Sequence, residues 1–177
     1  MRWRHLDWKT HARRVCTGDV RIRPLEERDL EEVIRLIRLH DTDDAEAATE
    51  GLRGAQLRRR VERAAHVVIE GGERDRVMGI SGWQVDDLEA EGVWWLGWTY
   101  VNPYEQGKGY GSMLMEFVLA MMRRFGARKL FLSTSSLEKY RAAISFYERH
   151  GFEREGRLRD FYADGEHQLI FGRRIGG

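Results

Sequence analysis

The sequence predicts a mixed α/β fold within a single domain. Short apolar runs typical of β-strands alternate with longer segments whose apolar residues recur at helical spacing. The chain has 177 residues, a length that suits one domain with a hydrophobic core. It contains no internal repeat and no interdomain linker. We therefore expect one domain over residues 19–177, preceded by an extension formed by residues 1–18.

The first expected elements are a strand and an amphipathic helix. Val20–Leu25 alternates with period two and predicts the first strand, which Pro24 ends because proline has no N–H for a sheet ladder. The helix that follows carries its apolar residues at helical spacing, namely Leu30, Val33, Ile34 and Ile37. This pattern indicates one helix face turned toward a core.

A second helix is expected after the acidic run at residues 41–44. Asp43 or Asp44 can serve as its N-cap, because a carboxylate accepts hydrogen bonds from the first N–H groups of a helix. The helix runs to about Ala64. Gly51 and Gly54 weaken its middle, so a kink or a break is expected there.

The remaining chain is expected to contain further strands and two further helices. The strands are His66–Glu70, Val77–Val85, Val93–Val101, Lys129–Thr134, a short strand from Phe152, and His167–Ile175. One helix follows the glycine-rich turn after Val101 and ends near Gly126, and the other covers Leu137–His150 and ends at Gly151. Glycine is expected at both helix ends because the terminal residue adopts a positive φ.

Charge and cysteine content narrow the class of protein. The 30 Lys and Arg residues and 29 Asp and Glu residues leave a formal charge of +1, which gives no electrostatic case for nucleic acid. No apolar run approaches transmembrane length, and no secretory signal is expected at the N-terminus. The single cysteine, Cys16, excludes an internal disulfide framework. A cytoplasmic protein without a bound metal is expected.

A glycine-rich turn lies between the Trp-rich strand and the following helix. Pro103 stops the strand, and glycines stand at alternate positions 107, 109 and 111 before the helix begins. The spacing does not match G-x-G-x-x-G of dinucleotide-binding folds, and Lys108 is not followed by the Ser or Thr of a P-loop. Strand, glycine turn and helix N-terminus together still predict a site where backbone N–H groups converge on an anion.

Two motifs resemble those of the GNAT superfamily of N-acetyltransferases. Gln106-Gly107-Lys108-Gly109-Tyr110-Gly111 matches its acetyl-CoA-binding pattern Q/R-x-x-G-x-G/A. About forty residues later, beyond another strand, Ala142–Phe152 is similar to the superfamily's A-I-x-F-Y-E-K-x-G-F segment. The resemblance covers roughly Val20 to Arg174. It implies a mixed, mostly antiparallel sheet of about seven strands, splayed between strands four and five and flanked by about four helices.

The resemblance also implies how acetyl-CoA, the acetyl donor, is bound. The pyrophosphate would be held by backbone N–H groups along the glycine turn. These groups belong to Gln106, Gly107, Lys108, Gly109, Tyr110, Gly111 and Ser112. The pantetheine arm would pair with the backbone of Thr99, Tyr100 and Val101 like an added strand. The superfamily commonly has an asparagine where this chain has Tyr140, so cofactor contacts from that helix are left open.

Catalytic roles follow from the same resemblance. The N–H of Val101 would stabilise the oxyanion of the thioester carbonyl, and Tyr147 would protonate the departing thiolate. The base that takes the proton of the amine is sought among the acids flanking strand four, first Glu89 and Glu91. Asp86 and Asp87 are alternatives at the end of strand three.

The predicted activity is direct transfer of an acetyl group from acetyl-CoA to a primary amine within a ternary complex. A small metabolite or amino-acid-like amine is the expected acceptor, and a peptide or protein amino group is the alternative within the enzyme class. A non-catalytic acyl-CoA sensor is the rival from another class, and Tyr147 favours catalysis over it. A homodimer is expected from the habit of the superfamily.

Overall fold

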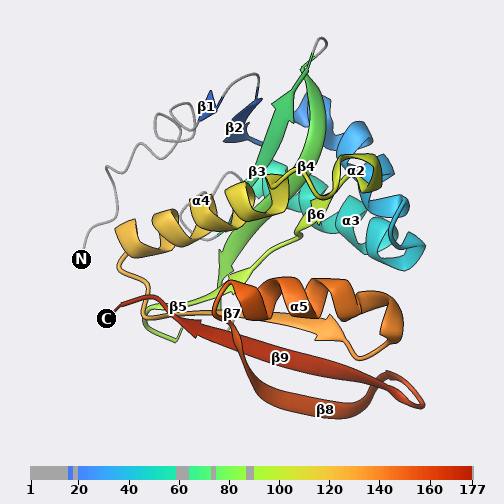
Figure 1. Ribbon diagram of the computed structural model, residues 1–177, viewed down its shortest axis with the longest axis vertical. Helices are drawn as coiled ribbons and strands as arrows, with labels where there is room; N and C mark the ends of the chain where they lie inside the picture. Colours follow the sequence, from blue (N-terminus) through green and yellow to red (C-terminus); the bar gives the residue numbers. More distant parts are fainter. Residues whose placement is uncertain (1–15, 18–19, 59–63, 73–74, 87–89, 177) are drawn as a thin grey trace. The chain divides into compact units, whose positions relative to one another are not determined.

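The computed structural model describes residues 16–17, 20–58, 64–72, 75–86 and 90–176 (Figure 1). These residues belong to two compact units. The first runs up to Val85 and resumes over Gly97–Met121, and the second comprises Asp86–Leu96 and the chain from Met122 onward. The predicted extension, residues 1–18, lies outside the described residues except for Cys16–Thr17.

The first unit is built on antiparallel strands. Each strand of this unit pairs with the next in the following order: β1 (Cys16–Thr17), β2 (Val20–Pro24), β3 (Ala64–Gly71), β4 (Arg76–Val85) and β6 (Tyr100–Val101). The register places Val68 of β3 beside Ile80 of β4, and Ile80 beside Tyr100 of β6. These paired residues therefore point to the same face of the sheet.

Helices α2 (Leu30–Arg38) and α3 (Thr42–Arg58) cover that face. Their apolar residues form one buried cluster with Val68 and Ile80, against which Trp98 and Tyr100 are packed. The predicted stripe of the first helix is confirmed, because Leu30, Val33, Ile34 and Ile37 are all buried.

Helix α3 differs from the prediction at its start and in its middle. The N-cap is Asp41, whose Oδ1 accepts the N–H groups of Asp43 (2.9 Å) and Asp44 (3.1 Å). Asp43 and Asp44, predicted as the cap, instead lie in the first turn of the helix, where carboxylates complement the positive end of its dipole. Gly51 and Gly54 do not break it, since α3 continues to Arg58.

Helix α4 (Tyr110–Arg124) covers the other face of these strands. Phe117 contacts the fully buried Trp83 with 6.4 Å between ring centroids. An added Cβ on Gly79 would lie 3.1 Å from Leu114 Cδ1, so glycine at this β4 position permits the helix to approach closely. Figure 1 shows α4 running across β3 and β4.

A buried ion network joins β2, β3 and the 3₁₀ turn Glu27–Asp29. Arg23 donates to both carboxylate oxygens of Asp29 (2.6 and 2.8 Å), and its Nη2 lies 2.5 Å from Glu70 Oε2. Arg21 approaches the other oxygen of Glu70. Burial by itself would raise the pKa of Asp29 and Glu70, but their hydrogen bonds to Arg23 and its charge lower both pKa values.

The second unit contains β5 (Val93–Leu96), β7 (Lys129–Ser135), β9 (Glu166–Arg174) and β8 (Glu153–Ala163), in this spatial order. β5 and β7 are parallel, while β7–β9 and β9–β8 are antiparallel. Helix α5 (Arg141–Arg149) lies along this sheet (Figure 1). Gly126 and Gly151 have φ values of 65° and 74°, as expected for the ends of α4 and α5.

The predicted fourth strand is divided into two. β5 pairs with β7 over Val93–Trp95, whereas β6 pairs with β4, and Gly97–Thr99 between them are not in a strand. The segment predicted as one strand is thus interrupted after Leu96. The fold class is confirmed: helices α2 to α5 with a mixed, mostly antiparallel set of strands among the described residues.

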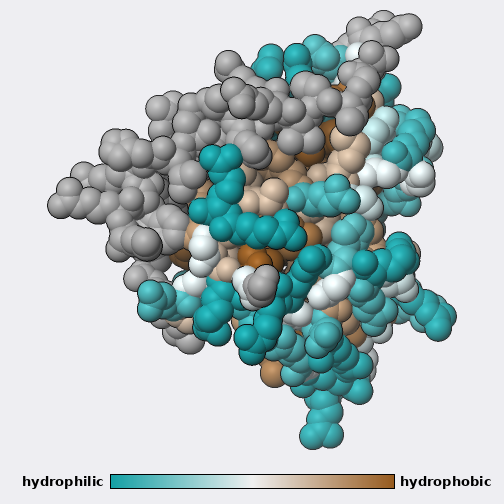
Figure 2. All heavy atoms as spheres, turned by 60° about the vertical axis from the view of Figure 1, so that its left-hand side comes forward, coloured by the Kyte–Doolittle hydropathy of each residue, from teal (hydrophilic) through white to brown (hydrophobic). Residues whose placement is uncertain are grey.

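The coloured residues in Figure 2 present mainly hydrophilic side chains, with apolar side chains visible between them. Such a mixed surface agrees with the near balance of acidic and basic residues. In the part of the chain that the structure describes, no helix is long and apolar enough to cross a membrane.

Candidate functional site

The turn between β6 and α4 is fixed by backbone and side-chain hydrogen bonds. Asn102 accepts the N–H of Tyr104 at its side chain (3.0 Å), and Pro103 opens the 3₁₀ turn Pro103–Glu105. The N–H of Glu105 then returns to the carbonyl of Asn102 (2.8 Å). The predicted end of the strand at Pro103 is therefore confirmed, and the glycines follow directly.

Gly107 and Gly109 adopt φ values of 77° and 87°. Side chains other than glycine rarely take this left-handed conformation. A Cβ added to either glycine would meet nothing within 4 Å, so both face open space. A group as wide as a phosphate can therefore reach the backbone here, and a side chain would occupy the same volume.

Helix α4 begins directly after these glycines. The N–H of Met113 donates to the carbonyl of Gly109 (3.0 Å). The first turn of the helix, before Met113, consists of Tyr110, Gly111 and Ser112. The first N–H groups of a helix have no partner within the helix and carry a partial positive charge. The open glycines and this helix start fit the pyrophosphate of acetyl-CoA.

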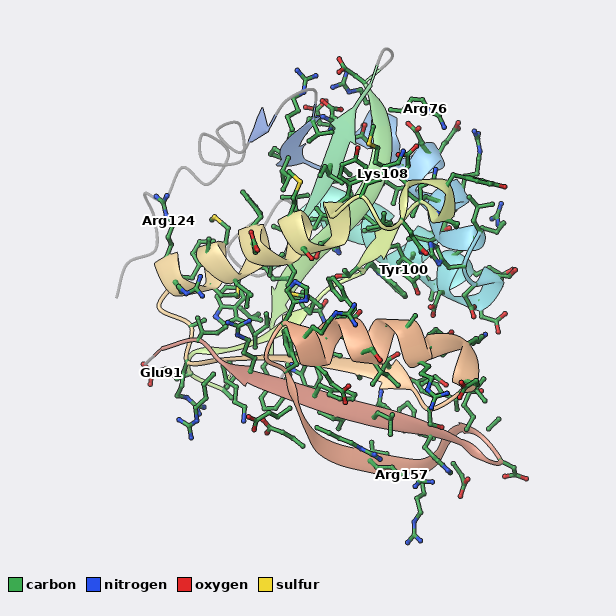
Figure 3. The ribbon with its side chains drawn as sticks, viewed as in Figure 1. Arg76, Glu91, Tyr100, Lys108, Arg124 and Arg157 are labelled. Carbon is green, nitrogen blue, oxygen red and sulfur yellow. The ribbon has the colours of Figure 1, made fainter. Side chains whose placement is uncertain are left out.

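Lys108 and Gln106 are exposed on the same turn. The ammonium of Lys108 lies 2.7 Å from Glu105 Oε2, and this hydrogen bond raises the pKa of Lys108 (Figure 3). The carboxylate of Glu105 thus partly offsets the positive charge of Lys108 at this turn.

The free edge of β6 presents the backbone of Val101. The N–H of Asn102 donates to Met78 of β4 (2.8 Å), and successive N–H groups of a strand point to alternate edges. The N–H and C=O of Val101 therefore point away from β4. Thr99 is held nearby, since its Oγ1 lies 2.9 Å from Ser81 Oγ and 3.0 Å from the carbonyl of Gly97.

Two polar side chains, from the end of α2 and from α3, contact β6, where Tyr100 adds a third polar group. His40, directly after α2, places Nε2 2.7 Å from the carbonyl of Val101. Its ring lies 5.1 Å from the ring of Tyr100, measured between centroids. The hydroxyl of Tyr100 in turn donates to Asp44 of α3. Figure 3 shows Tyr100 on β6.

Sequence reasoning missed this cluster. His40 and Val101 are separated by 61 positions and Asp44 and Tyr100 by 56, so no local pattern relates them. The only signal was an acidic run after the first helix, which was interpreted as a helix cap.

A second histidine is buried in β3. An added Cβ on Gly97 would lie 3.0 Å from the Nε2 atom of His66, which is buried and has no hydrogen-bond partner among the described residues. Burial lowers the pKa of His66 to about 4. The imidazole is therefore neutral at pH 7.

The second unit contains the other predicted catalytic residues. Tyr147 is half-buried in α5, with its ring edge-on to Phe146 (5.6 Å) and Phe152 (6.1 Å between centroids). Glu91 is exposed in the turn before β5 (Figure 3). Asp86 accepts the indole N–H of Trp95 (2.8 Å). Glu89 and Asp87 lie outside the described residues.

Tyr140, which stands in place of the superfamily's usual asparagine, ends the 3₁₀ turn Glu138–Tyr140 just before α5. Lys139 lies over its ring at 5.0 Å from the centroid. As for metals, the described residues contain no group of three or more His, Cys, Asp or Glu side chains that could hold an ion.

Comparison with known proteins agrees with this geometry. The model of the acetyltransferase (GNAT) family matches residues 26–152, which include the glycine turn and Tyr147. The chain belongs to the GNAT acetyltransferase family. This assignment confirms the resemblance seen in the sequence and, at the level of the family, the prediction of an N-acetyltransferase enzyme that uses acetyl-CoA.

A solved structure of a protein assigned to the GNAT acetyltransferase family from Desulfovibrio desulfuricans is similar, with a TM-score of 0.80 and 27% identity. The similarity covers 89% of this chain and 99% of that one. An aminoglycoside 6'-N-acetyltransferase, solved with coenzyme A, shares the fold with a TM-score of 0.68 and 14% identity, over 88% of this chain and 97% of that one.

Among curated proteins, the mycothiol acetyltransferase of Geodermatophilus obscurus is 37% identical over 83 residues. This segment is 45% of the present chain and only 26% of that protein, so this GNAT chain spans about a quarter of the relative's length. This relative and the aminoglycoside 6'-N-acetyltransferase are named for different compounds, and family membership leaves the acceptor open.

Proposed function

We propose that this GNAT protein transfers the acetyl group of acetyl-CoA directly to a primary amine of a small metabolite or amino-acid-like acceptor. The observation that carries the proposal is the left-handed, open pair Gly107 and Gly109 ahead of the N-terminus of α4. Gly165 is equally open, but only Gly107 and Gly109 lead directly into a helix N-terminus among the open left-handed glycines of the described residues. This combination would admit an anion to the backbone.

In this proposal the pyrophosphate is bound by N–H groups between Gln106 and Ser112. The partial positive charge of the helix start adds to these hydrogen bonds. The pantetheine arm lies along Thr99–Val101, where the edge of β6 that faces away from β4 offers backbone groups for pairing.

The chemical step uses two groups of the chain. The N–H of Val101 donates to the thioester oxygen as negative charge develops there, and such a preorganised donor typically lowers a barrier by about 3 kcal/mol. Tyr147, by resemblance to the family motif, protonates the thiolate of coenzyme A as the C–S bond breaks. The acetyl group passes directly between donor and amine, without an acetyl-enzyme.

A peptide or protein amino group is the alternative acceptor, and a non-catalytic acyl-CoA sensor is the alternative function. The Tyr147→Phe variant distinguishes an enzyme from a sensor. An enzyme should lose turnover in this variant, whereas a sensor has no turnover and should keep its affinity for acetyl-CoA. The homodimer and the cytoplasmic location remain predictions from the sequence.

The proposal is tested by titrating acetyl-CoA into the purified protein in a calorimeter. The wild type is expected to bind, and Gly109→Val is expected to lose binding because the new side chain fills the anion position. Gly165→Val is the matched control: Gly165, in the β8–β9 turn, has a φ of 79° and also meets nothing within 4 Å. It carries the same backbone strain and should leave binding unchanged. A folded wild type that binds no acetyl-CoA would overturn the proposal.

A further inference from the structure

The proton acceptor for the amine is the missing part of the mechanism above. Glu91 is exposed in the second unit, whereas the edge of β6 in the first unit carries a titratable side chain already bound to it. That side chain is His40. The inference that follows rests on the proposed function, because it uses Val101 as the site of the acetyl group.

His40 is bound to the same residue that is proposed to hold the thioester. The N–H and C=O of Val101 point to the same edge of β6, away from β4, and the C=O is taken by His40 Nε2 at 2.7 Å. The imidazole therefore lies next to the N–H proposed as the oxyanion donor.

The hydrogen bond also fixes where the ring carries its proton. A carbonyl oxygen only accepts, so Nε2 must be the donor, and in the neutral ring the lone pair is then on Nδ1. Among the described residues no hydrogen bond to Nδ1 of His40 is found. The ring thus offers a basic nitrogen while its other nitrogen is anchored.

The end of α2 and the ring of Tyr100 fix the position of His40. Its backbone N–H donates to Ile37 at the end of α2 (2.9 Å), and its ring contacts Tyr100. The titratable groups around it are Asp41, the next residue, Tyr100 on β6, and Asp44 of α3, which accepts the Tyr100 hydroxyl.

We propose that His40 is the general base that activates the acceptor amine, with Tyr100 and Asp44 as positioning residues. The acceptor arrives as an ammonium and gives one proton to Nδ1 of His40, which passes it to water. The neutral nitrogen forms a C–N bond with the thioester carbon, and the C–S bond breaks. The thiolate takes a proton from Tyr147, and the second proton of the nitrogen restores Tyr147 through solvent, so that one proton is released overall.

The first test needs no acceptor. Long-range proton–nitrogen NMR of the histidine side chains in the wild type, with His40→Gln for assignment, reports which ring nitrogen is protonated. At pH 8 the resonances of His40 are expected to show a protonated Nε2 and an unprotonated Nδ1. The opposite tautomer would leave no base at Nδ1 and would overturn the proposal.

The second test compares two nucleophiles in thiol-release assays at saturating acetyl-CoA. Ethylamine is protonated near pH 7.5 and needs a base, whereas hydroxylamine is mostly neutral. In His40→Gln, whose amide can still donate to Val101, kcat/KM for ethylamine should fall about a hundredfold or more. The acidic limb of its pH profile should move to the higher pH at which ethylamine itself loses its proton, while the hydroxylamine rate changes little.

The control is His167→Gln, since His167 lies in the β8–β9 hairpin and accepts the N–H of Asp160 (2.9 Å). It should leave both rates unchanged. Equal losses with both nucleophiles in His40→Gln would show a structural role for His40 and contradict the proposal. This result would leave the proposed function intact if acetyl-CoA still binds, whereas absent binding in the wild type would overturn the proposed function itself.

Discussion

Two polar clusters in the first unit differ in how deeply their side chains are buried. The network of Arg23, Asp29 and Glu70 is buried, with exposed fractions of 9, 5 and 1%, and both carboxylates bind the Arg23 guanidinium. The cluster of His40, Tyr100 and Asp44 is half-buried and leaves a basic ring nitrogen at the strand edge.

The difference separates a structural cluster from a functional one. A buried charge that loses its partner is costly, so the first cluster holds β2, β3 and the 3₁₀ turn in one arrangement. In the second cluster each bond orients a group whose reactive side remains available. Substitutions in the first should therefore change stability, and those in the second should change activity.

The largest expected effect is on stability, from Arg23→Ala. The substitution leaves Asp29 and Glu70 buried without their shared partner, and the free energy of unfolding should fall by about 3–5 kcal/mol. Denaturant unfolding measures the loss. Arg28→Ala is the control, because Arg28 and Glu26 form an exposed pair at 2.8 Å; it should cost at most about 1 kcal/mol. Equal losses in the two variants would show that the buried network stabilises the fold no more than an exposed ion pair does.

The next effect is a pH dependence that comes from His66. Its folded pKa of about 4 lies below the value of an exposed histidine, so only the unfolded state takes up a proton between about pH 6.5 and 4. Stability should therefore decrease as the pH falls through this window, by up to about 1.4 kcal/mol per pH unit from this residue.

His66→Asn should remove this slope. Asp29 and Glu70 titrate at lower pH: because their folded pKa values are lowered, their contribution is present above their ordinary pKa near 4 and is lost below it. Unfolding curves measured from pH 8 to pH 3 in both proteins resolve the two windows. An unchanged slope above pH 4.5 in the variant would refute the role of His66.

A smaller stability effect is expected from Tyr100→Phe. The variant keeps the ring beside His40 but loses the hydrogen bond to Asp44, and it should lose about 1–2 kcal/mol of unfolding free energy. If the cluster positions the base, kcat/KM for the amine also falls in the folded variant, while its affinity for acetyl-CoA is retained. A variant with normal turnover would remove Tyr100 from the functional cluster.

The smallest effect is expected from Lys108→Ala. Lys108 is exposed and bound to Glu105, and the turn is proposed to bind the pyrophosphate through its backbone. The Kd for acetyl-CoA should stay within about threefold of the wild type, because one exposed charge contributes little in water. Calorimetry of this variant beside Gly109→Val gives the comparison, and a large loss would assign binding to the side chain instead.

The sequence alone determined the parts of this protein that depend on neighbouring residues. The helical stripe of α2, the end of β6 before Pro103, the glycine-rich turn and the family motifs all lie within short segments. Their physical causes are local: periodicity, a missing N–H and a missing Cβ. This is why the fold class and the glycine turn could be predicted.

Only the tertiary structure decided that the strand predicted over Val93–Val101 is interrupted after Leu96, that β5 pairs with β7, and which side chains meet at β6. Apolar and aromatic residues occur on both sides of Leu96, so their pattern could not reveal the interruption. His40 and Asp44 reach Val101 and Tyr100 because α2 and α3 pack their apolar faces on the strand beside β6. These contacts of His40 and Asp44 depend on how the whole core packs, so no local sequence pattern could predict them.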